Sequence, residues 1–417
     1  QAEWLPDSLA VSFLAPDSRG TAQVWRAAVT GAAPQPVTRA ERAVEQYAWS
    51  PDGTRLLYVM NEPKSSEQAA HEKEWGVVIS PEEHWPARAS LWVLETASGR
   101  ASKVTDGRFA PGAPVWSPDG KRIAFLYHNA AAQPWQLYLA DSGGGAKPSA
   151  VTNSKTGVHS LAWSPDGRSI AFVAATPDPQ PYENLFQRPV FQGVGSVWLY
   201  DVAAGTSRRL TAQDYPGLAR VVWSRDSRRL AFLSRPPGTM GSRGAEDTLH
   251  ILSLDGKVRA TASGFDFYRG GHNLTWSADH REVWFFNGER MGSNVFAVDA
   301  STGAVRAVTT GQDSITEVTW SRDFTDAAYL FENANTKPDI FVTRLPGWRG
   351  VKDTDLNPEV RRFALGRSEI IRYPSEGFEI EALLVKPPDF DPARKYPLLL
   401  IIHGGPAWYK KNDWRLH

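Results

Sequence analysis

The stretch Trp163–Val173, which reads Trp-Ser-Pro-Asp-Gly-Arg-Ser-Ile-Ala-Phe-Val, decides how the rest of the chain is organised. Its first five residues recur unchanged at 49–53 and 116–120. They recur in altered form at 4–8, 223–227, 276–280 and 320–324. The seven copies stand 44 to 67 residues apart. Self-similarity at such a period indicates one supersecondary unit repeated along the chain.

Each copy predicts a tight turn between two antiparallel strands. The Ser hydroxyl can bond back to the chain, Pro has its φ preset, and Gly accepts a positive φ at the exit. An apolar, β-rich run follows every turn, for example 123–126, and a second such run and a short fourth segment come after it. Four short strands in about 45 residues are typical of a β-propeller blade. We therefore predict a mainly β protein with a seven-bladed propeller over residues 1–347, with eight blades as the alternative.

The seven repeat tryptophans are predicted to wedge between neighbouring blades as core side chains rather than to stack on a ligand. Two insertions, at about 61–90 and 176–195, lie between the second and third strands of their blades. Because strands in a blade alternate in direction, all such connections emerge on the face opposite the repeat turns. The chain is expected to leave the propeller on that same face.

Composition excludes several classes of function. Lys plus Arg equals Asp plus Glu, 46 each, so nothing favours nucleic acid or an anionic membrane surface as a partner. Cysteine is absent, which excludes disulfides, a thiol nucleophile and Cys-based zinc sites. His71 and His84 stand near several glutamates, but no His-Glu-x-x-His spacing occurs, and we expect neither a metal nor a cofactor. No apolar run reaches membrane-spanning length.

The repeat pattern ends at residue 347. Residues 348–365 are charged and lack the repeat pattern, which indicates a linker. Three strand-like runs follow at 368–373, 378–385 and 396–402, and the third is nearly all apolar, as in a strand buried on both faces of an α/β sheet. It runs directly into His403-Gly404-Gly405-Pro406. Two glycines at the end of such a strand can expose a backbone N–H to a developing oxyanion.

The combination resembles the prolyl oligopeptidase family of serine peptidases, in which a β-propeller precedes an α/β-hydrolase domain. The stretch 396–406 is similar to the acylaminoacyl-peptidase and dipeptidyl-peptidase branches of that family. The resemblance implies that Gly405 supplies one backbone N–H of the oxyanion hole and that His403 and Gly404 shape its loop. It makes residues 366–417 the start of the hydrolase domain, and it implies hydrolysis of short peptides by Ser-His-Asp acyl transfer.

The sequence departs from the family in one respect that bears on activity. The 417 residues contain no Gly-x-Ser-x-Gly, so the nucleophile and its Asp and His partners are expected to lie outside this chain, which should be inactive alone. The expected partners are a peptide substrate and the missing hydrolase portion, in cis or as a separate chain; homo-oligomerisation stays open. Because the sequence starts at Gln1, we expect a processed chain, and a secreted or periplasmic location is favoured over the cytoplasm.

Two further hypotheses follow from the same resemblance. Glu82 and Glu83, on the first insertion, could hold the free α-amine of a substrate, although a solvated acidic loop is the favoured interpretation. The alternative function is a non-catalytic propeller, similar to TolB-type modules, that serves as a protein-binding platform. The apolar run ending in His-Gly-Gly-Pro argues for the peptidase. Without the rest of the sheet, the segment after about 363 should be poorly ordered or dock against another molecule.

Overall fold

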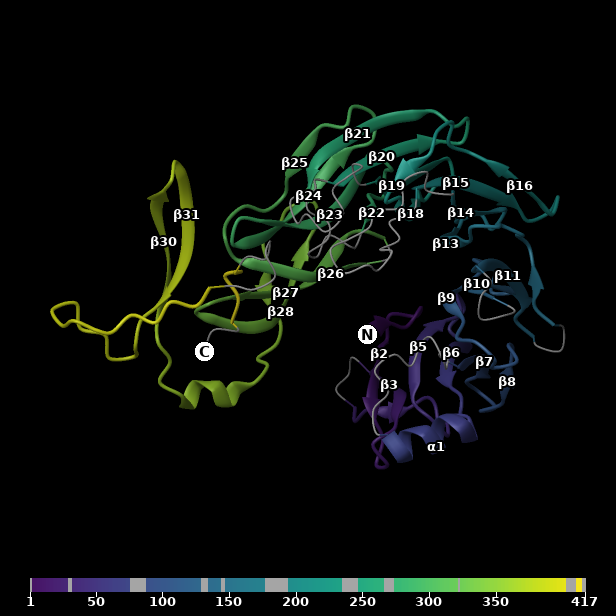
Figure 1. Cartoon of the computed structure of the whole chain (residues 1–417), viewed down its shortest axis with the longest axis horizontal. Helices are drawn as coiled ribbons and strands as arrows, with labels where there is room; N and C mark the ends of the chain where they lie inside the picture. Colours follow the sequence, from purple (N-terminus) through teal and green to yellow (C-terminus); the bar gives the residue numbers. More distant parts are fainter. Residues whose placement is uncertain are drawn as a thin grey trace. The chain divides into compact units, whose positions relative to one another are not determined.

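The computed structural model describes residues 2–28, 32–75, 88–128, 134–143, 147–176, 194–234, 247–265, 274–321, 323–402 and 410–414. The chain separates into two compact units, one formed by 1–178 with 193–214 and the other by 215–417 with 179–192. Each unit contains groups of four antiparallel strands in which consecutive strands are neighbours, and we call each such group a module (Figure 1).

The first unit holds modules one to four. Their strands are β1 Ala2–Trp4, β2 Ala10–Pro16, β3 Ala22–Ala28 and β4 Gln35–Pro36; β5 Val44–Trp49, β6 Arg55–Asn61, β7 Ala89–Glu95 and β8 Ala101–Lys103; β9 Gly112–Trp116, β10 Arg122–Tyr127, β11 Gln136–Asp141 and β12 Ser149–Ala150; β13 Val158–Trp163, β14 Ser169–Ala175, β15 Val194–Asp201 and β16 Thr206–Arg209. The helix α1, Ser66–Trp75, lies in the connection between β6 and β7 and was not predicted.

The second unit holds modules five to seven and the segment that follows them. After the short strand β17, Tyr215–Pro216, come β18 Ala219–Trp223, β19 Arg229–Ser234, β20 Asp247–Ser253 and β21 Val258–Phe265; β22 Thr275–Trp276, β23 Glu282–Glu289, β24 Gly292–Asp299 and β25 Val305–Ala307; β26 Ser314–Trp320, β27 Asp326–Asn333, β28 Thr336–Arg344 and β29 Val351–Lys352. A parallel bridge between Ser293 and Ser314 joins modules six and seven. The prediction of repeated four-stranded units is confirmed in the described residues, which contain seven; the number of blades in a closed ring stays a prediction.

The repeat turn connects the first and second strands of each module, as predicted. In module four the Ser164 hydroxyl donates to Asp166 Oδ1 at 2.6 Å and accepts from the backbone N–H of Ser169 at 2.9 Å. Gly167 follows with a φ of 71°. These bonds close the turn within six residues, so local chemistry alone sets where each hairpin forms.

The repeat tryptophans connect neighbouring modules. Trp49 Nε1 donates to Ser12 Oγ of the preceding module at 2.9 Å, and Trp116 Nε1 donates to the carbonyl of Ala48 at 3.0 Å. The core prediction is confirmed for Trp49, Trp116, Trp223 and Trp276, which are buried, while Trp163 and Trp320 are half-buried. Trp4, the first copy, is 50% exposed and departs from the prediction.

In each unit, an arginine at the start of the second strand of one module contacts the repeat tryptophan of the next module. The guanidinium of Arg55 lies 5.1 Å from the ring centre of Trp116 and donates to the carbonyl of Gly120 at 2.7 Å. Arg229 stands in the same relation to Trp276 in the second unit, and it donates to the carbonyl of His280 at 2.5 Å. Cation–π contact and charge-assisted hydrogen bonding therefore reinforce the same junction in both units.

The chain beyond module seven differs from the prediction in two places. The fourth strand of module seven, β29, lies at 351–352, inside the stretch predicted as linker, because it pairs with Phe341 and Val342 of β28. The hairpin of β30, Ser368–Ser375, and β31, Phe378–Val385, confirms two of the three predicted strands, and a 3-10 helix, η2, covers Pro358–Arg362.

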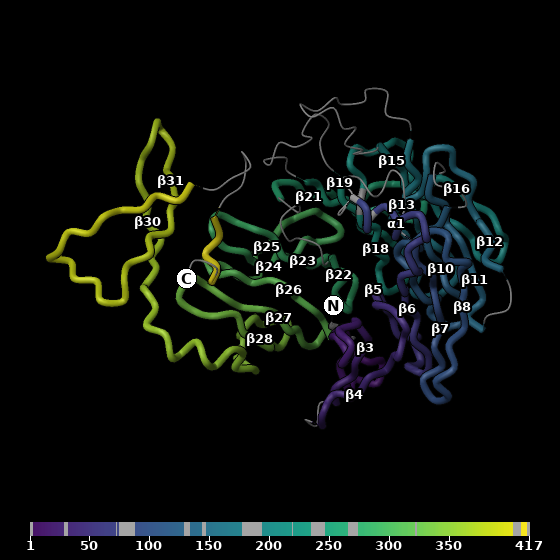
Figure 2. The backbone as a smooth tube through the Cα atoms, turned by 60° about the horizontal axis from the view of Figure 1, so that its bottom comes forward, coloured from purple at the N-terminus to yellow at the C-terminus, as the bar shows by residue number. Residues whose placement is uncertain are grey.

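The prediction of a third strand at 396–402 is wrong. These residues form no strand, and residues 398–402 are 63 to 82% exposed. Figure 2 traces their backbone in yellow, beyond β31. A β-strand needs a neighbour for its backbone N–H and C=O groups, and the described residues offer this segment none. The apolar character that predicted a doubly buried strand therefore appears as an exposed apolar run.

Candidate functional site

The residues predicted to carry chemistry lie outside the described residues. His403, Gly404 and Gly405 fall in the stretch 403–409, and Glu82 and Glu83 fall in 76–87. The structure does describe the chain on both sides of the first stretch, at 402 and at 410. It also describes the surface of the second unit that holds β30–β31 and residues 410–414.

That surface is one edge of modules six and seven. It consists of the β23–β24 turn with Arg290 and Met291, the β25–β26 connection with Gln312, and the β27–β28 turn with Ala334 and Asn335. We call these five residues the docking face. The face is opposite the repeat turns, because it combines connections between second and third strands with a connection between modules. The prediction that the chain leaves the modules on this face is confirmed within the second unit by the contacts that follow.

The first contact is a carboxylate clamp on β31. Glu381 Oε1 accepts from Arg290 Nη1 at 3.1 Å, from Gln312 Nε2 at 2.9 Å and from Arg372 Nε at 3.1 Å. The Glu381 side chain is only 14% exposed, whereas Arg290 is 56% exposed. A partly buried carboxylate with three donors, two of them charged, makes a stronger contact than a single surface ion pair.

The second contact is an amide clamp at the start of β30. Asn335 Nδ2 donates to the carbonyl of Ser368 at 2.8 Å, and Asn335 Oδ1 accepts from the N–H of Ser368 at 2.8 Å. The side chain therefore pairs with the backbone as a neighbouring strand would. The first residue of β30 is thus fixed on the β27–β28 turn.

The third contact holds the described residues after the predicted oxyanion loop. Asn412 donates through its backbone N–H to the carbonyl of Met291 at 2.6 Å and through Nδ2 to the carbonyl of Gln312 at 2.9 Å. Its Oδ1 accepts from the N–H of Ala334 at 3.0 Å, and the N–H of Trp414 donates to Glu332 Oε2 at 3.0 Å. One asparagine thus joins all three elements of the docking face.

A buried carboxylate fixes the path between module seven and η2. Asp339 on β28 is 1% exposed, and its Oδ1 accepts from Thr354 Oγ1 and from the N–H of Leu356, both at 2.8 Å. Its Oδ2 pairs with Lys352 at 2.5 Å and Lys337 at 3.2 Å. Burial alone would raise the pKa of Asp339, but these donors hold the pKa well below its usual range. The carboxylate is therefore ionised and anchors residues 352–356.

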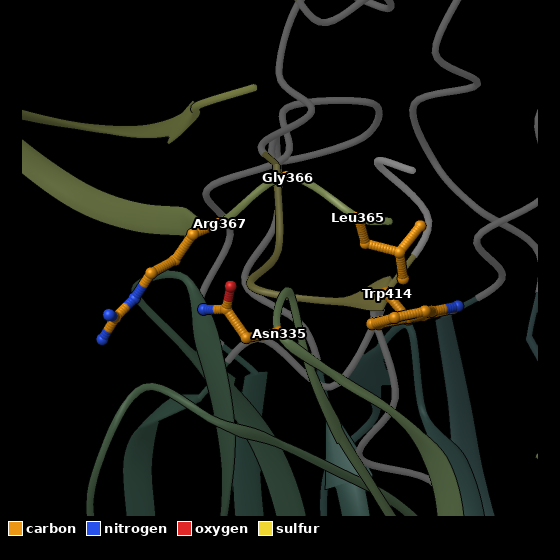
Figure 3. A pocket seen from close by; sticks show the side chains of 5 residues that line it. All are labelled: Asn335, Leu365, Gly366, Arg367 and Trp414. Carbon is orange, nitrogen blue, oxygen red and sulfur yellow. The ribbon is translucent and has the colours of Figure 1, made fainter. Parts of the chain in front are cut away.

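A hollow of about 420 Å³ lies beside the amide clamp. Figure 3 shows Leu365 beside the indole of Trp414, with Asn335 between these two and Arg367, which extends away. The lining combines two apolar side chains with one amide and one guanidinium. Such a mixed lining suits packing against another chain segment or a ligand with both apolar and acceptor groups.

The described edge of the first insertion also carries an unpredicted carboxylate. Glu62, just after β6, accepts through Oε1 from Ser90 Oγ at 2.6 Å and from Lys103 Nζ at 2.7 Å. Burial opposes ionisation, but these two hydrogen bonds outweigh it and lower the pKa of Glu62. Its partners tie the insertion's base to β7 and β8, which makes Glu62 a structural residue.

Sequence reasoning missed the residues of the docking face and their partners. Asn335 and Asn412 belong to no motif, and nothing in their neighbourhood in the chain marks them. Within the part of the chain that the structure describes, no group of three His, Cys, Asp or Glu side chains could hold a metal ion. Over the same residues, every helix is too short or too polar to cross a membrane.

Comparisons with known proteins agree with the arrangement of modules. No family model matches the chain. Dipeptidyl-peptidase 5 of Aspergillus fumigatus is 24% identical over 234 residues, which cover 51% of this chain and 31% of that protein. The acylaminoacyl peptidase of Pyrococcus horikoshii superposes with a TM-score of 0.58 at 14% identity, over 93% of this chain and 57% of the other.

A third comparison concerns a propeller by itself. The β-propeller domain of the Trilobed protease from Pyrococcus furiosus superposes with a TM-score of 0.53 at 13% identity, over 84% of this chain and 94% of that domain. The match to the curated dipeptidyl-peptidase spans less than a third of that relative's length. The modules therefore have the fold of a peptidase propeller.

Proposed function

We propose that this chain, a propeller region of the prolyl oligopeptidase family, forms the gating portion of a serine peptidase that hydrolyses short peptides. The observation that carries the proposal is the superposition of nearly the whole chain on an acylaminoacyl peptidase, together with the His-Gly-Gly-Pro that follows an apolar run. Acylaminoacyl-peptidase and dipeptidyl-peptidase activities are the two candidates. A TolB-like binding platform would not require an apolar run followed by His-Gly-Gly-Pro after the propeller.

The proposed chemistry is acyl transfer from a peptide to a serine. The Ser hydroxyl attacks the scissile carbonyl, its proton passes to His, and the amine leaves with that proton before water releases the acyl group. The nucleophile, His and Asp are proposed to lie outside these 417 residues. This chain would contribute the N–H of Gly405 to the oxyanion, with His403 and Gly404 shaping the loop.

The proposed domain organisation follows from the same assignment. The propeller occupies residues 1–347, a linker 348–365 and the first part of the hydrolase domain 366–417. The strand β29 extends the last module into the linker by a few residues. The docking face holds both β30–β31 and residues 410–414 on modules six and seven, and 215–417 belong to one compact unit.

The test compares this chain with the complete polypeptide that contains it. We expect the complete protein to release chromophore from N-acyl-aminoacyl or dipeptidyl substrates and to be labelled by a serine-directed fluorophosphonate. The 417-residue chain alone should do neither. A complete protein that is folded, unlabelled and inactive on both substrate classes would favour the binding platform.

Gly405 has its own test in the complete protein. Gly405→Pro removes the N–H, and loss of one oxyanion donor lowers kcat by roughly 10²- to 10³-fold. Gly405→Ala keeps the N–H and serves as the matched control with a smaller loss. An unchanged melting temperature shows that each variant is folded, and equal kcat in both variants would remove Gly405 from the oxyanion hole.

Glu82 and Glu83 are proposed as amine ligands only if the substrate has a free N-terminus. The double variant Glu82→Gln, Glu83→Gln keeps the size of both side chains and removes their charge. An amine clamp predicts a selective loss of activity on free N-termini relative to blocked ones. An unchanged ratio of the two activities would assign both residues to a solvated acidic loop.

A further inference from the structure

The hollow beside the amide clamp has a polar side and an apolar side. Figure 3 shows the side chains of Leu365 and Trp414 on one side of Asn335 and the side chain of Arg367 on the other. Its volume of about 420 Å³ is that of a small-molecule site, which typically spans about 300–1,000 Å³. A ligand that fills the hollow therefore meets apolar surface at one end and N–H donors at the other.

The backbone around the hollow is held in place without a ligand. The Asn335 side chain makes two hydrogen bonds to the backbone of Ser368. The N–H of Lys386, just after β31, donates to the carbonyl of Arg367 at 2.9 Å. A Cβ at Gly366 would overlap the carbonyl of Lys386, so only glycine lets the chain lie this close to the end of β31. A preformed site binds its ligand without the entropic cost of first ordering the chain.

Two donors on the polar side are available to a ligand. Among the described residues, the exposed guanidinium of Arg367 makes neither a hydrogen bond nor an ion pair. The carboxylate of Glu369, two positions away, pairs with Lys386 at 2.7 Å instead. The Asn335 Nδ2 amide carries two N–H groups and uses one of them for the carbonyl of Ser368. The polar side thus offers one cation and one neutral donor.

A carboxylate attached to an apolar group matches this lining. Its two oxygens can accept from a guanidinium and a neighbouring amide together, and Arg367 alone balances its single charge. A phosphate monoester carries a charge of about −1.5 to −2 at neutral pH, whereas the lining contains one cation. Leu365 and the indole of Trp414 can cover an aliphatic or aromatic group next to the carboxylate. The C-terminal residue of a peptide combines both parts.

We propose that this hollow binds the C-terminal residue of a peptide that ends in an apolar side chain. The terminal carboxylate accepts from Arg367 and from Asn335 Nδ2, and the apolar side chain packs against Leu365 and Trp414. The inference goes beyond the proposed function and does not rest on it, because binding here needs neither a nucleophile nor an oxyanion hole.

The experiment uses the complete protein and two fluorinated dipeptides. The probe is acetyl-leucyl-4-fluorophenylalanine with a free carboxylate, and the reference is the same dipeptide as its C-terminal amide. Broadening of the ¹⁹F signal of each dipeptide as protein is added gives its dissociation constant, before and after treatment with a serine-directed fluorophosphonate. We expect the acid to bind roughly tenfold more tightly than the amide, because only the acid pairs with Arg367. Sodium chloride at about 1 M should weaken the binding of the acid alone.

Three variants assign the contacts. Arg367→Gln removes the charge and should abolish the preference for the acid over the amide. Trp414→Ala should weaken the binding of both compounds and leave the ratio of their dissociation constants nearly unchanged. The matched control is Arg362→Gln, which removes an exposed arginine of η2 that does not line the hollow, and it should keep wild-type values for both compounds. An unchanged melting temperature shows that each variant is folded.

The outcomes separate this inference from the proposed function. Equal affinity of the wild-type protein for acid and amide, or an unchanged preference in Arg367→Gln, overturns the inference. Loss of acid binding after labelling by the fluorophosphonate would place the dipeptide at the catalytic serine and overturn the inference alone. Tighter binding of inorganic phosphate in competition with the acid would overturn the assignment to a peptide. A protein that resists labelling and cleaves no peptide, but binds the acid through Arg367, overturns only the proposed function.

Discussion

The unaltered turns of modules two to four and the altered turns of modules five to seven differ in sequence and agree in structure. The Ser hydroxyl lies 2.5–2.6 Å from the Asp oxygen in the first group and 2.6–2.7 Å in the second. The fourth turn position has a φ of 68–71° at Gly53, Gly120 and Gly167. At Ser227, His280 and Phe324 the angle is 59–61°.

This comparison shows which residues define the turn. Pro and Gly have been replaced in modules five to seven without loss of the hairpin, whereas Ser and Asp remain. Pro and Gly mainly reduce the conformational cost of the turn, and a non-glycine residue at positive φ raises that cost by about 1 kcal/mol. The Ser and Asp side chains supply the hydrogen bonds, and they decide where the turn forms.

The largest effect is expected at the repeat tryptophan. Trp276 is 2% exposed, and Trp276→Ala should lower the free energy of unfolding by about 3–5 kcal/mol because it opens a cavity in the core. Trp4 is 50% exposed, so Trp4→Ala should cost under about 1 kcal/mol. Urea unfolding followed by far-UV circular dichroism measures both. Similar losses would show that exposure does not separate these two positions.

The next effect concerns the turn serine. Ser164 and Ser224 are both buried, and each donates to the turn Asp at 2.6 Å and accepts from the residue five positions later at 2.9 Å. Replacement by Ala should cost about 1–3 kcal/mol in either turn, because a part-buried backbone N–H loses its acceptor. If Ser224→Ala were neutral while Ser164→Ala was not, the altered turns would be held by other contacts.

A smaller effect of opposite sign is expected from exchanging the fourth turn residue. Gly167→Ser should destabilise the protein by about 0.5–1 kcal/mol, and Ser8→Gly should stabilise it by a similar amount, because both positions have positive φ. A Cβ at Gly167 meets only Pro118, at 3.8 Å, so steric overlap does not add to the cost. Thermal unfolding of the two variants and of the double variant checks the signs, and two losses would refute the account.

The smallest effect is on the titration of the turn aspartates. Hydrogen bonds from Ser117 and Ser277 lower the pKa of Asp119 and of Asp279 below the ordinary value. A folded-state pKa below the unfolded one contributes stability above the unfolded pKa, and that contribution disappears as pH falls through the folded pKa. Ser117→Ala and Ser277→Ala should each move the neighbouring pKa upward in an NMR titration. A rise in one turn alone would show that the two turns are not equivalent.

Much of the fold could be predicted because its determinants are local. The hydrogen bonds of each turn join residues two to five positions apart, and the composition of the apolar runs that follow predicts strands. The hairpin at 368–385 was predictable for the same reason. The run 396–402 has an equally clear pattern, but a strand also needs a pairing partner, which the pattern of one segment cannot supply.

The candidate site was predictable only as a motif. His403-Gly404-Gly405 can be recognised in the sequence, because two glycines directly after an apolar run indicate a sharp turn with an accessible backbone N–H. The anchors around it are not. Asn412 and Gln312 are 100 positions apart, and Arg290 and Glu381 are 91 apart. Their pairing depends on where the turns of modules six and seven come together.

The repeat, its turns and the family resemblance could be predicted from the sequence, since these depend on residues within a few positions of one another. The fold was needed to show that the edge opposite the repeat turns holds the hairpin β30–β31 and residues 410–414. The fold was also needed to show that Asp339 is buried among Lys337, Lys352 and the backbone of Leu356. Hydrogen bonds and ion pairs between distant segments form where strand alternation places the connections, and that placement exists only once the modules have folded.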